Sequence, residues 1–189
     1  MRVLNVGGGA SRTLPRHYAG WEQVLLDIDP DVQPDVCLDA LEIDTMPAAQ
    51  YDAVYCSHNL EHFYRHDVPR VVKGFHHVLK RTGWAEIAVP DLQALMKEVV
   101  SKGADLEDTW YRCSAGPIRY HDVLYGWGEV MGDGNLHYAH KCGFTEKSLG
   151  RVLREAGFAS VRIARDGFNL LSFAFKTRPN ARVVRTLGV

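Results

Sequence analysis

The sequence has no apolar run approaching the roughly 20 residues that a bilayer-spanning helix needs. The apolar start, Met1–Val6, is too short for the hydrophobic core of a signal peptide. We therefore expect a cytoplasmic protein without membrane contact. With 46% hydrophobic and 24% charged residues over 189 positions, the composition is that of a folded protein of one domain rather than a disordered chain.

The sequence also lacks paired cysteines and a net positive charge. The four cysteines, at positions 37, 56, 113 and 142, form no C-x-x-C pair, so a zinc knuckle or redox dithiol is excluded and free thiols are expected. The net charge is −1, and basic residues outnumber acidic ones strongly in residues 151–189 alone. Nucleic acid is therefore not an expected partner, and the sequence does not indicate an oligomeric state.

Short apolar segments of strand length alternate with helical patterns. Asp67, Asp91 and Thr145 occupy positions suited to helix N-caps, while Gly83 and Gly103 suit helix ends. This alternation predicts an α/β fold with a mostly parallel sheet and helices on both faces. The predicted strands are 2–6, 22–28, 35–38, 51–56, 84–89, 159–164 and 169–175, and the last two are close enough to form an antiparallel hairpin.

Two regions fall outside this alternation. Residues 104–143 fit neither the helix nor the strand period, and they are rich in Gly, Tyr, Trp and His, so we expect a lid-like insertion over the strand ends. Residues 177–189 are basic and are expected to be a mobile tail. The predicted organisation is therefore a single domain over residues 1–176, followed by this tail.

Gly7-Gly8-Gly9 follows the first predicted strand directly. A turn without Cβ atoms lets the backbone approach a ligand and points N–H groups toward it, so this position favours a nucleotide site. The dinucleotide pattern G-x-G-x-x-G fails because Arg12 stands where its third glycine belongs, and no P-loop motif occurs. The alternative is a tight turn that binds no ligand.

Acidic residues follow the next two strands. Asp27, in Leu26-Asp27-Ile28-Asp29, lies 18 residues after Gly9, close to the spacing at which a carboxylate binds ribose hydroxyls. Asp39-Ala40 follows the third strand, where an adenine amino group would lie. Each acid alone is better explained as a solvated loop residue or a helix cap. Together they favour a ligand at the carboxyl ends of the strands.

The chain resembles the class I S-adenosylmethionine-dependent methyltransferases, particularly the small predicted methyltransferases of type 11. The resemblance implies a Rossmann-like seven-stranded sheet of order 3-2-1-4-5-7-6 with strand 7 antiparallel, and S-adenosylmethionine as cofactor. The segments that carry it are VLNVGGGAS (3–11), LLDIDP (25–30), PDVCLDA (34–40), YDAVYCSHNLEHF (51–63), VVKGFHHVLKRTGWAEIAVPDL (71–92) and VLYGWGEVMGDGNLHYAHKCGFTEKSLGRVLREAGF (123–158).

The resemblance also implies roles for individual residues. Gly7 and Gly9 would flank the methionine part of the cofactor, Asp27 would hold the ribose, and Asp39 with Ala40 would meet the adenine. Ile28 and Ser57 complete the expected cofactor-binding set. One departure is Gly8, where the family more often has Cys or Ser, and loss of a side chain there leaves the expectation of binding intact.

His58-Asn59-Leu60-Glu61-His62 matches H-x-x-E-H, which on a helix can direct two imidazoles toward zinc. Similar methyltransferases carry a comparable S-x-x-L-E-H here, so we interpret the segment as a polar turn near the methyl donor and expect no metal. The [DN]-P-P-[YF] tetrad of methyltransferases that act on adenine or glutamine amino groups is absent. Those acceptors are therefore disfavoured.

Methyl transfer from a sulfonium is an in-line displacement of an already activated group, so positioning supplies much of the acceleration. If a proton must be removed from the acceptor, histidine has the suitable pKa. His137 and His140 are the predicted catalytic residues, because Asn135–Phe144 resembles the family's lid. The predicted function is methylation of a small molecule or glycan precursor, and the alternatives are a non-catalytic S-adenosylmethionine-binding protein and a zinc hydrolase that uses the H-x-x-E-H segment.

Overall fold

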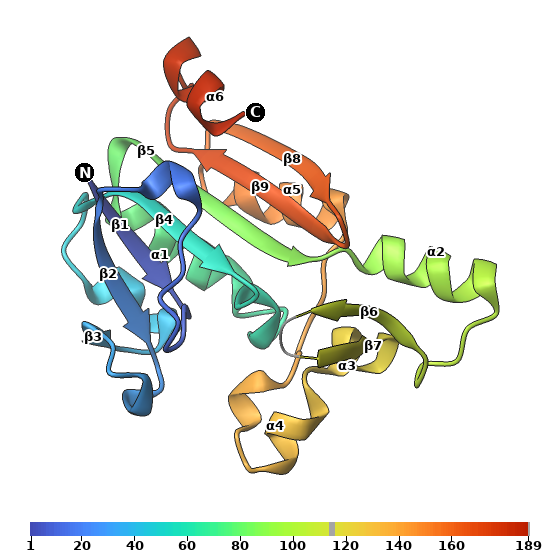
Figure 1. Cartoon of the computed structure of the whole chain (residues 1–189). Coiled ribbons are helices and arrows are strands. Elements are labelled where there is room, and N and C mark those ends of the chain that lie inside the picture. Colours follow the sequence, from blue (N-terminus) through green and yellow to red (C-terminus); the bar gives the residue numbers. More distant parts are fainter. Residues whose placement is uncertain (114–115, 189) are drawn as a thin grey trace.

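The computed structural model describes residues 1–113 and 116–188. Its centre is a seven-stranded sheet of order β3-β2-β1-β4-β5-β9-β8 (Figure 1). All neighbours from β3 to β5 pair in parallel, whereas β9 is antiparallel to both β5 and β8. The predicted order, with its antiparallel seventh strand, is confirmed. The strands are β1 (Arg2–Val6), β2 (Glu22–Asp27), β3 (Val36–Cys37), β4 (Tyr51–Ser57), β5 (Leu79–Pro90), β8 (Ser160–Asp166) and β9 (Asn169–Phe175).

The fifth strand differs from its prediction at its start. The sequence pattern places the strand at 84–89, with Gly83 ending the preceding helix. In the structure the helix ends at Val78, and Leu79 has an extended backbone that pairs with Tyr51 of β4. Gly83 therefore lies inside β5, where an added Cβ would come within 2.9 Å of the Asp52 carbonyl oxygen.

Helices α1 (Val68–Val78) and α5 (Glu146–Glu155) cover one face of the sheet. The predicted apolar stripe of α1 is buried, with Val71, Phe75 and Val78 fully inaccessible to solvent. Thr145 caps α5 through its hydroxyl, as predicted, by accepting a hydrogen bond from the Ser148 amide. The Asp67 side chain makes no such bond to α1, although it occupies the expected capping position.

The opposite face is covered more thinly. Tyr18, from the short 3-10 helix at Arg16–Tyr18, packs there against Trp84 and Phe175 of the sheet. Helix α6 (Ala181–Leu187) adds Val183 and Leu187 to the same cluster. The segment expected to be a mobile tail therefore contains a helix in contact with the sheet, and its mobility stays a prediction. Figure 1 shows α6 at the end of the sheet opposite α3 and α4.

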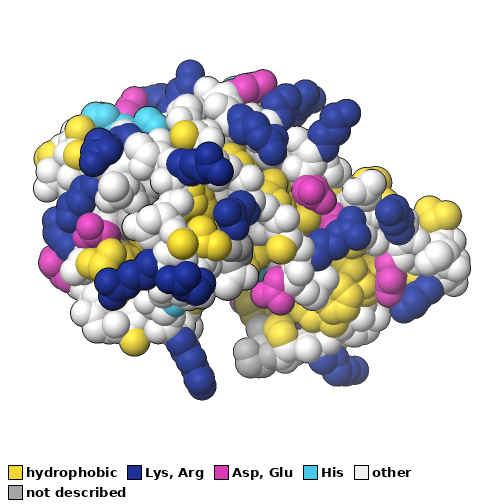
Figure 2. All heavy atoms as spheres, turned by 90° about the horizontal axis from the view of Figure 1, so that it is seen from above, with side chains coloured by type: hydrophobic (Ala, Val, Ile, Leu, Met, Phe, Trp, Pro, Cys, Tyr) yellow, Lys and Arg dark blue, Asp and Glu magenta, His cyan; other side chains and the backbone are white. Residues whose placement is uncertain are grey.

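The region around residues 104–143 projects beyond the carboxyl ends of the parallel strands (Figure 1). Its core is Leu95 of α2 packed against Tyr120 and Val123. The other apolar side chains of α2 are less covered, and Met96 and Val100 are 53% and 81% exposed. Figure 2 shows hydrophobic side chains on the surface of the lobe at its right. The elements are α2 (Leu92–Lys102), β6 (Thr109–Cys113), β7 (Gly116–Arg119), α3 (Tyr120–Tyr125) and α4 (Gly128–Gly132), with β6 and β7 antiparallel.

None of the helices formed by residues 1–113 and 116–188 combines the length and the apolar composition that a membrane crossing requires.

Candidate active site

The glycine turn follows β1 directly and is hydrogen-bonded to the neighbouring strand β2. The Gly7 amide donates to the Leu26 carbonyl oxygen at 2.8 Å, and Gly7 has φ +68°, in the left-handed region that favours glycine. A Cβ at Gly7 would collide with the Asn59 side chain, and one at Gly8 would collide with Asn5. Gly8, the departure from the family pattern, is therefore required by the buried Asn5 beneath it.

Asp27 ends β2 and connects to this turn. Its Oδ2 accepts a hydrogen bond from the Gly9 amide at 3.1 Å, and its Oδ1 accepts one from the Asp29 amide at 3.1 Å. A carboxylate oxygen can accept more than one hydrogen bond, so both oxygens keep capacity for a ligand. The carboxylate is thus held in place by backbone groups on two loops.

Asp39 begins a 3-10 helix at Ala40–Thr45, and its side chain caps that helix by accepting a hydrogen bond from the Leu41 amide at 2.9 Å. Ala40 is buried at 5% exposure. This arrangement fixes the loop after β3 beside the loop after β2.

Two adjoining cavities of about 230 and 120 Å³ lie at these strand ends, and we call them together the strand-end crevice. Gly7, Asp27 and Ile28 line both parts. Asp39 and Ala40 line the larger part, and Gly9 lines the smaller. The structure therefore brings six of the seven predicted cofactor residues together.

Ser57 is the seventh predicted residue, and it lines neither part of the crevice. The turn that follows β4 lines the crevice instead, because its residues Asn59 and His62 line both parts. Lys141, from the insertion, lines the larger part. The S-x-x-L-E-H similarity indicated this turn, but no local pattern indicated that Lys141 would reach it.

A third cavity, of about 480 Å³, lies between the sheet and the insertion, and we call it the insertion cavity. Its wall is rich in aromatic rings, and the Phe168 ring lies 4.4 Å from that of Trp110 and 4.9 Å from that of Tyr111, centroid to centroid. It is lined by His58, His62, Pro90, Trp110, Tyr111, Cys113, Ile118, Asp122, Val123, Trp127, Tyr138, His140, Phe168 and Asn169.

The crevice and the insertion cavity share three lining residues, His58, His62 and Tyr138. The two predicted catalytic histidines fall on different sides of this boundary. His137 lines both parts of the crevice, whereas His140 lines the insertion cavity. The histidines therefore face different cavities, although only two residues lie between them.

Glu61 lies at this boundary with its side chain buried at 1% exposure. It belongs to the 3-10 helix η4 (Leu60–His62), and its carbonyl oxygen accepts hydrogen bonds from the amides of Lys141 and Cys142. These bonds attach the end of the insertion to η4. Because η4 is a single 3-10 turn, H-x-x-E-H does not form the helix on which a zinc hydrolase of that motif depends.

The side chains of Glu61, His58 and His140 shift one another's pKa values. Burial alone would raise the pKa of Glu61, but His58, with contributions from His62 and His140, holds it below its usual value. Burial alone would lower the pKa of His58, but the Glu61 carboxylate raises it. Burial lowers the pKa of His140 despite the opposing effect of Glu61.

Comparisons with known proteins agree with this geometry. A family model described as a methyltransferase domain matches residues 1–163. No curated protein matches the sequence. A S-adenosylmethionine-dependent methyltransferase from Archaeoglobus fulgidus superposes with a TM-score of 0.59 at 16% identity, covering 93% of this chain and 86% of that one.

Two further solved structures share the fold. The 1,6-didemethyltoxoflavin-N1-methyltransferase of Burkholderia thailandensis has a TM-score of 0.53 at 19% identity, covering 94% of this chain and 71% of that one. A putative O-methyltransferase from Nostoc punctiforme has a TM-score of 0.61 at 13% identity, covering 93% of this chain and 51% of that one. With the family match over most of its length, the chain belongs to the methyltransferase-domain family and is a class I S-adenosylmethionine-dependent methyltransferase.

Proposed function

We propose that the chain transfers the methyl group of S-adenosylmethionine to a small acceptor bound in the insertion cavity. The observation that carries this proposal is the shared boundary of His58, His62 and Tyr138, which places the strand-end crevice directly beside an aromatic-lined cavity. In-line displacement needs the donor and the acceptor on either side of such a boundary.

The crevice residues fit an adenosine-bearing cofactor. Gly9 has nothing within 4 Å of an added Cβ, so its backbone is open to the methionine part, whereas the Asn59 side chain occupies that space at Gly7. Asp27 lines both parts of the crevice with a carboxylate held by backbone amides, which suits a ribose diol. Ile28 and Ala40 offer an apolar wall for the adenine, beside the polar Asp39.

The bound cofactor supplies an activated methyl group, and the chain's own residues position the acceptor. Aromatic side chains stack well on flat rings and on the apolar faces of sugars, so the wall around Phe168 favours an acceptor with a planar apolar face. A glycan precursor with such a face belongs to the same class. His140 is the proposed acceptor contact, and His137 is proposed to contact the cofactor.

A turnover assay tests this proposal. The chain is incubated with S-adenosylmethionine and a panel of phenols, heterocycles and sugar nucleotides, and release of S-adenosylhomocysteine is followed. Phe168→Ala should raise the acceptor KM by about fivefold and leave cofactor affinity unchanged, because an aromatic stack contributes about 1 kcal/mol beyond its area. Tyr125→Ala is the matched control, since Tyr125 is an aromatic residue of the insertion that is 55% exposed and lines no part of the cavity.

Two results would contradict the proposal. Equal effects of Phe168→Ala and Tyr125→Ala would show that the acceptor does not bind in the insertion cavity. Tight cofactor binding without turnover on any member of the panel would favour the non-catalytic binding protein instead.

A further inference from the structure

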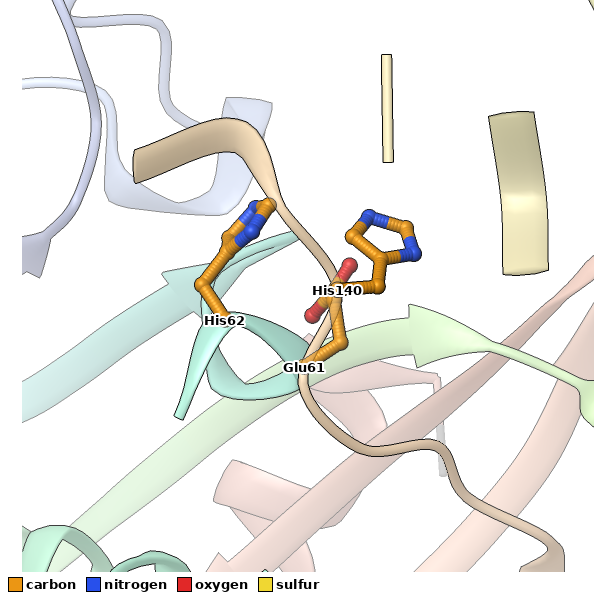
Figure 3. Close-up of side chains that lie close together, drawn as sticks. All are labelled: Glu61, His62 and His140. Atoms are coloured by element: carbon orange, nitrogen blue, oxygen red, sulfur yellow. The ribbon is translucent and has the colours of Figure 1, made fainter. Parts of the chain in front are cut away.

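Glu61, His62 and His140 form a compact cluster at the boundary between the two cavities. One ligand atom from each side chain lies within 4.8 Å of the other two. Figure 3 shows the Glu61 carboxylate between the two imidazoles, with His62 on one side and His140 on the other. Two come from η4 and one from the insertion, so the fold rather than a local motif assembles the cluster.

Within the part of the chain that the structure describes, the carboxylate in this cluster has no hydrogen-bond partner, and its nearest basic neighbour is His58. Over residues 1–113 and 116–188, no hydrogen bond reaches either oxygen of Glu61, although the side chain is 1% exposed. The nearest basic atom is His58 Nδ1, 3.4 Å from Oε1, which is beyond the usual length of a hydrogen bond to a charged group. A buried carboxylate without hydrogen bonds is costly, so the site is suited to a cation.

The two imidazoles are oriented by backbone carbonyls. His62 Nδ1 lies 3.1 Å from the Ala139 carbonyl oxygen, and His140 Nδ1 lies 2.9 Å from that of Val123. A carbonyl oxygen accepts only, so each Nδ1 carries the proton and each Nε2 keeps a free lone pair. Metal-binding histidines usually donate their second nitrogen to a carbonyl or carboxylate in this way.

We propose that Glu61, His62 and His140 bind a divalent first-row transition metal, of which zinc is the test case. Two imidazole nitrogens and one carboxylate oxygen are the ligand set of several catalytic zinc sites, in which a fourth position stays open. Because His62 and His140 line the insertion cavity, the open position faces that cavity.

The cluster differs from the one that H-x-x-E-H suggests. A helical motif would use His58 and His62 as ligands, whereas the structure replaces His58 with His140, which is 78 residues away from His62 in the sequence. The proposal departs from the sequence-based expectation of no metal, which was argued from the H-x-x-E-H segment. The proposal rests on the cluster that the fold forms instead.

A role for the metal in catalysis rests on the proposed function, whereas the site itself does not. An acceptor hydroxyl at the open position would become more acidic and lose its proton to solvent. Its oxygen would then form a bond to the methyl carbon as the carbon–sulfur bond breaks, and the electron pair would stay on sulfur in S-adenosylhomocysteine.

Zinc binding is tested on the full chain after chelator treatment and removal of the chelator. Calorimetric titration with zinc chloride alone should show one site per chain, and magnesium should bind far more weakly because it prefers oxygen ligands. His140→Ala and Glu61→Gln should each weaken zinc binding by at least tenfold. His121→Ala is the matched control, since His121 lies in the same insertion outside the cluster.

A second measurement uses the wild-type chain alone and therefore does not depend on whether a variant folds. Cobalt added to the wild-type chain should give the visible absorption of a four- or five-coordinate ion, and zinc should abolish it. Absence of stoichiometric zinc binding, or equal losses in His121→Ala and His140→Ala, would overturn the proposal.

The same samples separate this proposal from the proposed function. If S-adenosylhomocysteine binds the wild-type chain but zinc does not, the metal site is refuted and the methyltransferase reading stands. If zinc binds but S-adenosylhomocysteine does not, the metal site stands and the proposed function is refuted.

Discussion

The Gly9 amide donates a hydrogen bond to Asp27 Oδ2 at 3.1 Å, joining the turn after β1 to the end of β2 across 18 residues of sequence. The carboxylate therefore positions the glycine turn as well as facing the crevice. A substitution at Asp27 should affect both the ribose contact and the shape of the turn.

Gly7→Ala should weaken S-adenosylhomocysteine binding by about tenfold or more. The left-handed φ of +68° disfavours alanine, and the new Cβ would displace Asn59 from the crevice wall. The dissociation constant from calorimetry is the measurement.

Gly20→Ala is the control for Gly7→Ala, because Gly20 has φ +78° but nothing within 4 Å of an added Cβ. It should lower stability by about 1 kcal/mol and leave binding unchanged. If both variants bind equally well, the proposed contact between the turn and the ligand is wrong.

The sheet was predictable because it is built from local patterns. Apolar runs predict the strands, the short connection between β8 and β9 predicts an antiparallel hairpin, and the family resemblance implies the strand order. The start of β5 was not predictable from the sequence. The pairing of Leu79 with Tyr51 extends the strand through Lys80–Gly83, and this segment has no apolar alternation.

The site was predictable in the same measure. Gly7, Asp27 and Asp39 follow strands directly, so their position in sequence determines their place at the sheet edge. The positions of Ser57 and Lys141 relative to the crevice were not predictable. The turn after β4 and the path by which the insertion leads back to the sheet both depend on contacts between distant segments. The pairing of His140 with Glu61 has the same origin.

Cysteine labelling should follow exposure and acidity. Cys37 and Cys113 are exposed and should react with iodoacetamide first. Burial raises the pKa of Cys142 to about 11, so its labelling should be on the order of a hundredfold slower near neutral pH. Burial also raises the pKa of Cys56 well above its usual value, and this residue should react only after unfolding.

Peptide mapping by mass spectrometry identifies the labelled cysteine at each time point. Early modification of Cys56 in the folded chain would contradict the packing of β4.

Glu86 should make stability depend on pH. Burial raises the pKa of Glu86, although Tyr18, whose hydroxyl donates at 2.8 Å, and His17, whose Nε2 lies 2.7 Å away, oppose the effect. A carboxyl with a raised folded-state pKa stabilises the fold at low pH, and this contribution is lost as pH rises through that pKa. Glu86→Gln should therefore gain stability relative to the wild type as the pH rises above about 4, the ordinary pKa of a glutamate carboxyl.

Urea denaturation across that pH range gives the free energy of unfolding of both chains. A difference that stays constant with pH, or that changes in favour of the wild type as pH rises, would refute the assignment.

Asp91→Ala should destabilise the fold by about 2 kcal/mol or more. Asp91 Oδ1 caps α2 through the amides of Gln93 and Ala94, and Oδ2 lies 2.8 Å from Arg165 Nε on β8. The Asp91 side chain is 1% exposed, and its loss leaves both amides and the Arg165 guanidinium without this partner. Thermal unfolding monitored by circular dichroism is the measurement.

Asn180→Ala removes the cap of α6, an exposed terminal helix, and should cost much less than Asp91→Ala. Equal costs would mean that Asp91 contributes as an ordinary cap and that its contact with Arg165 adds nothing.

Calorimetric titration of the wild-type chain with S-adenosylhomocysteine, in parallel with Asp27→Asn and the exposed control Asp31→Asn, tests the account most directly. We predict one site per chain for the wild type and Asp31→Asn, and at least a tenfold weaker site for Asp27→Asn, since a hydrogen bond to a charged group contributes about 1.5–3 kcal/mol. Binding that is absent in the wild type, or unchanged by Asp27→Asn, would contradict it.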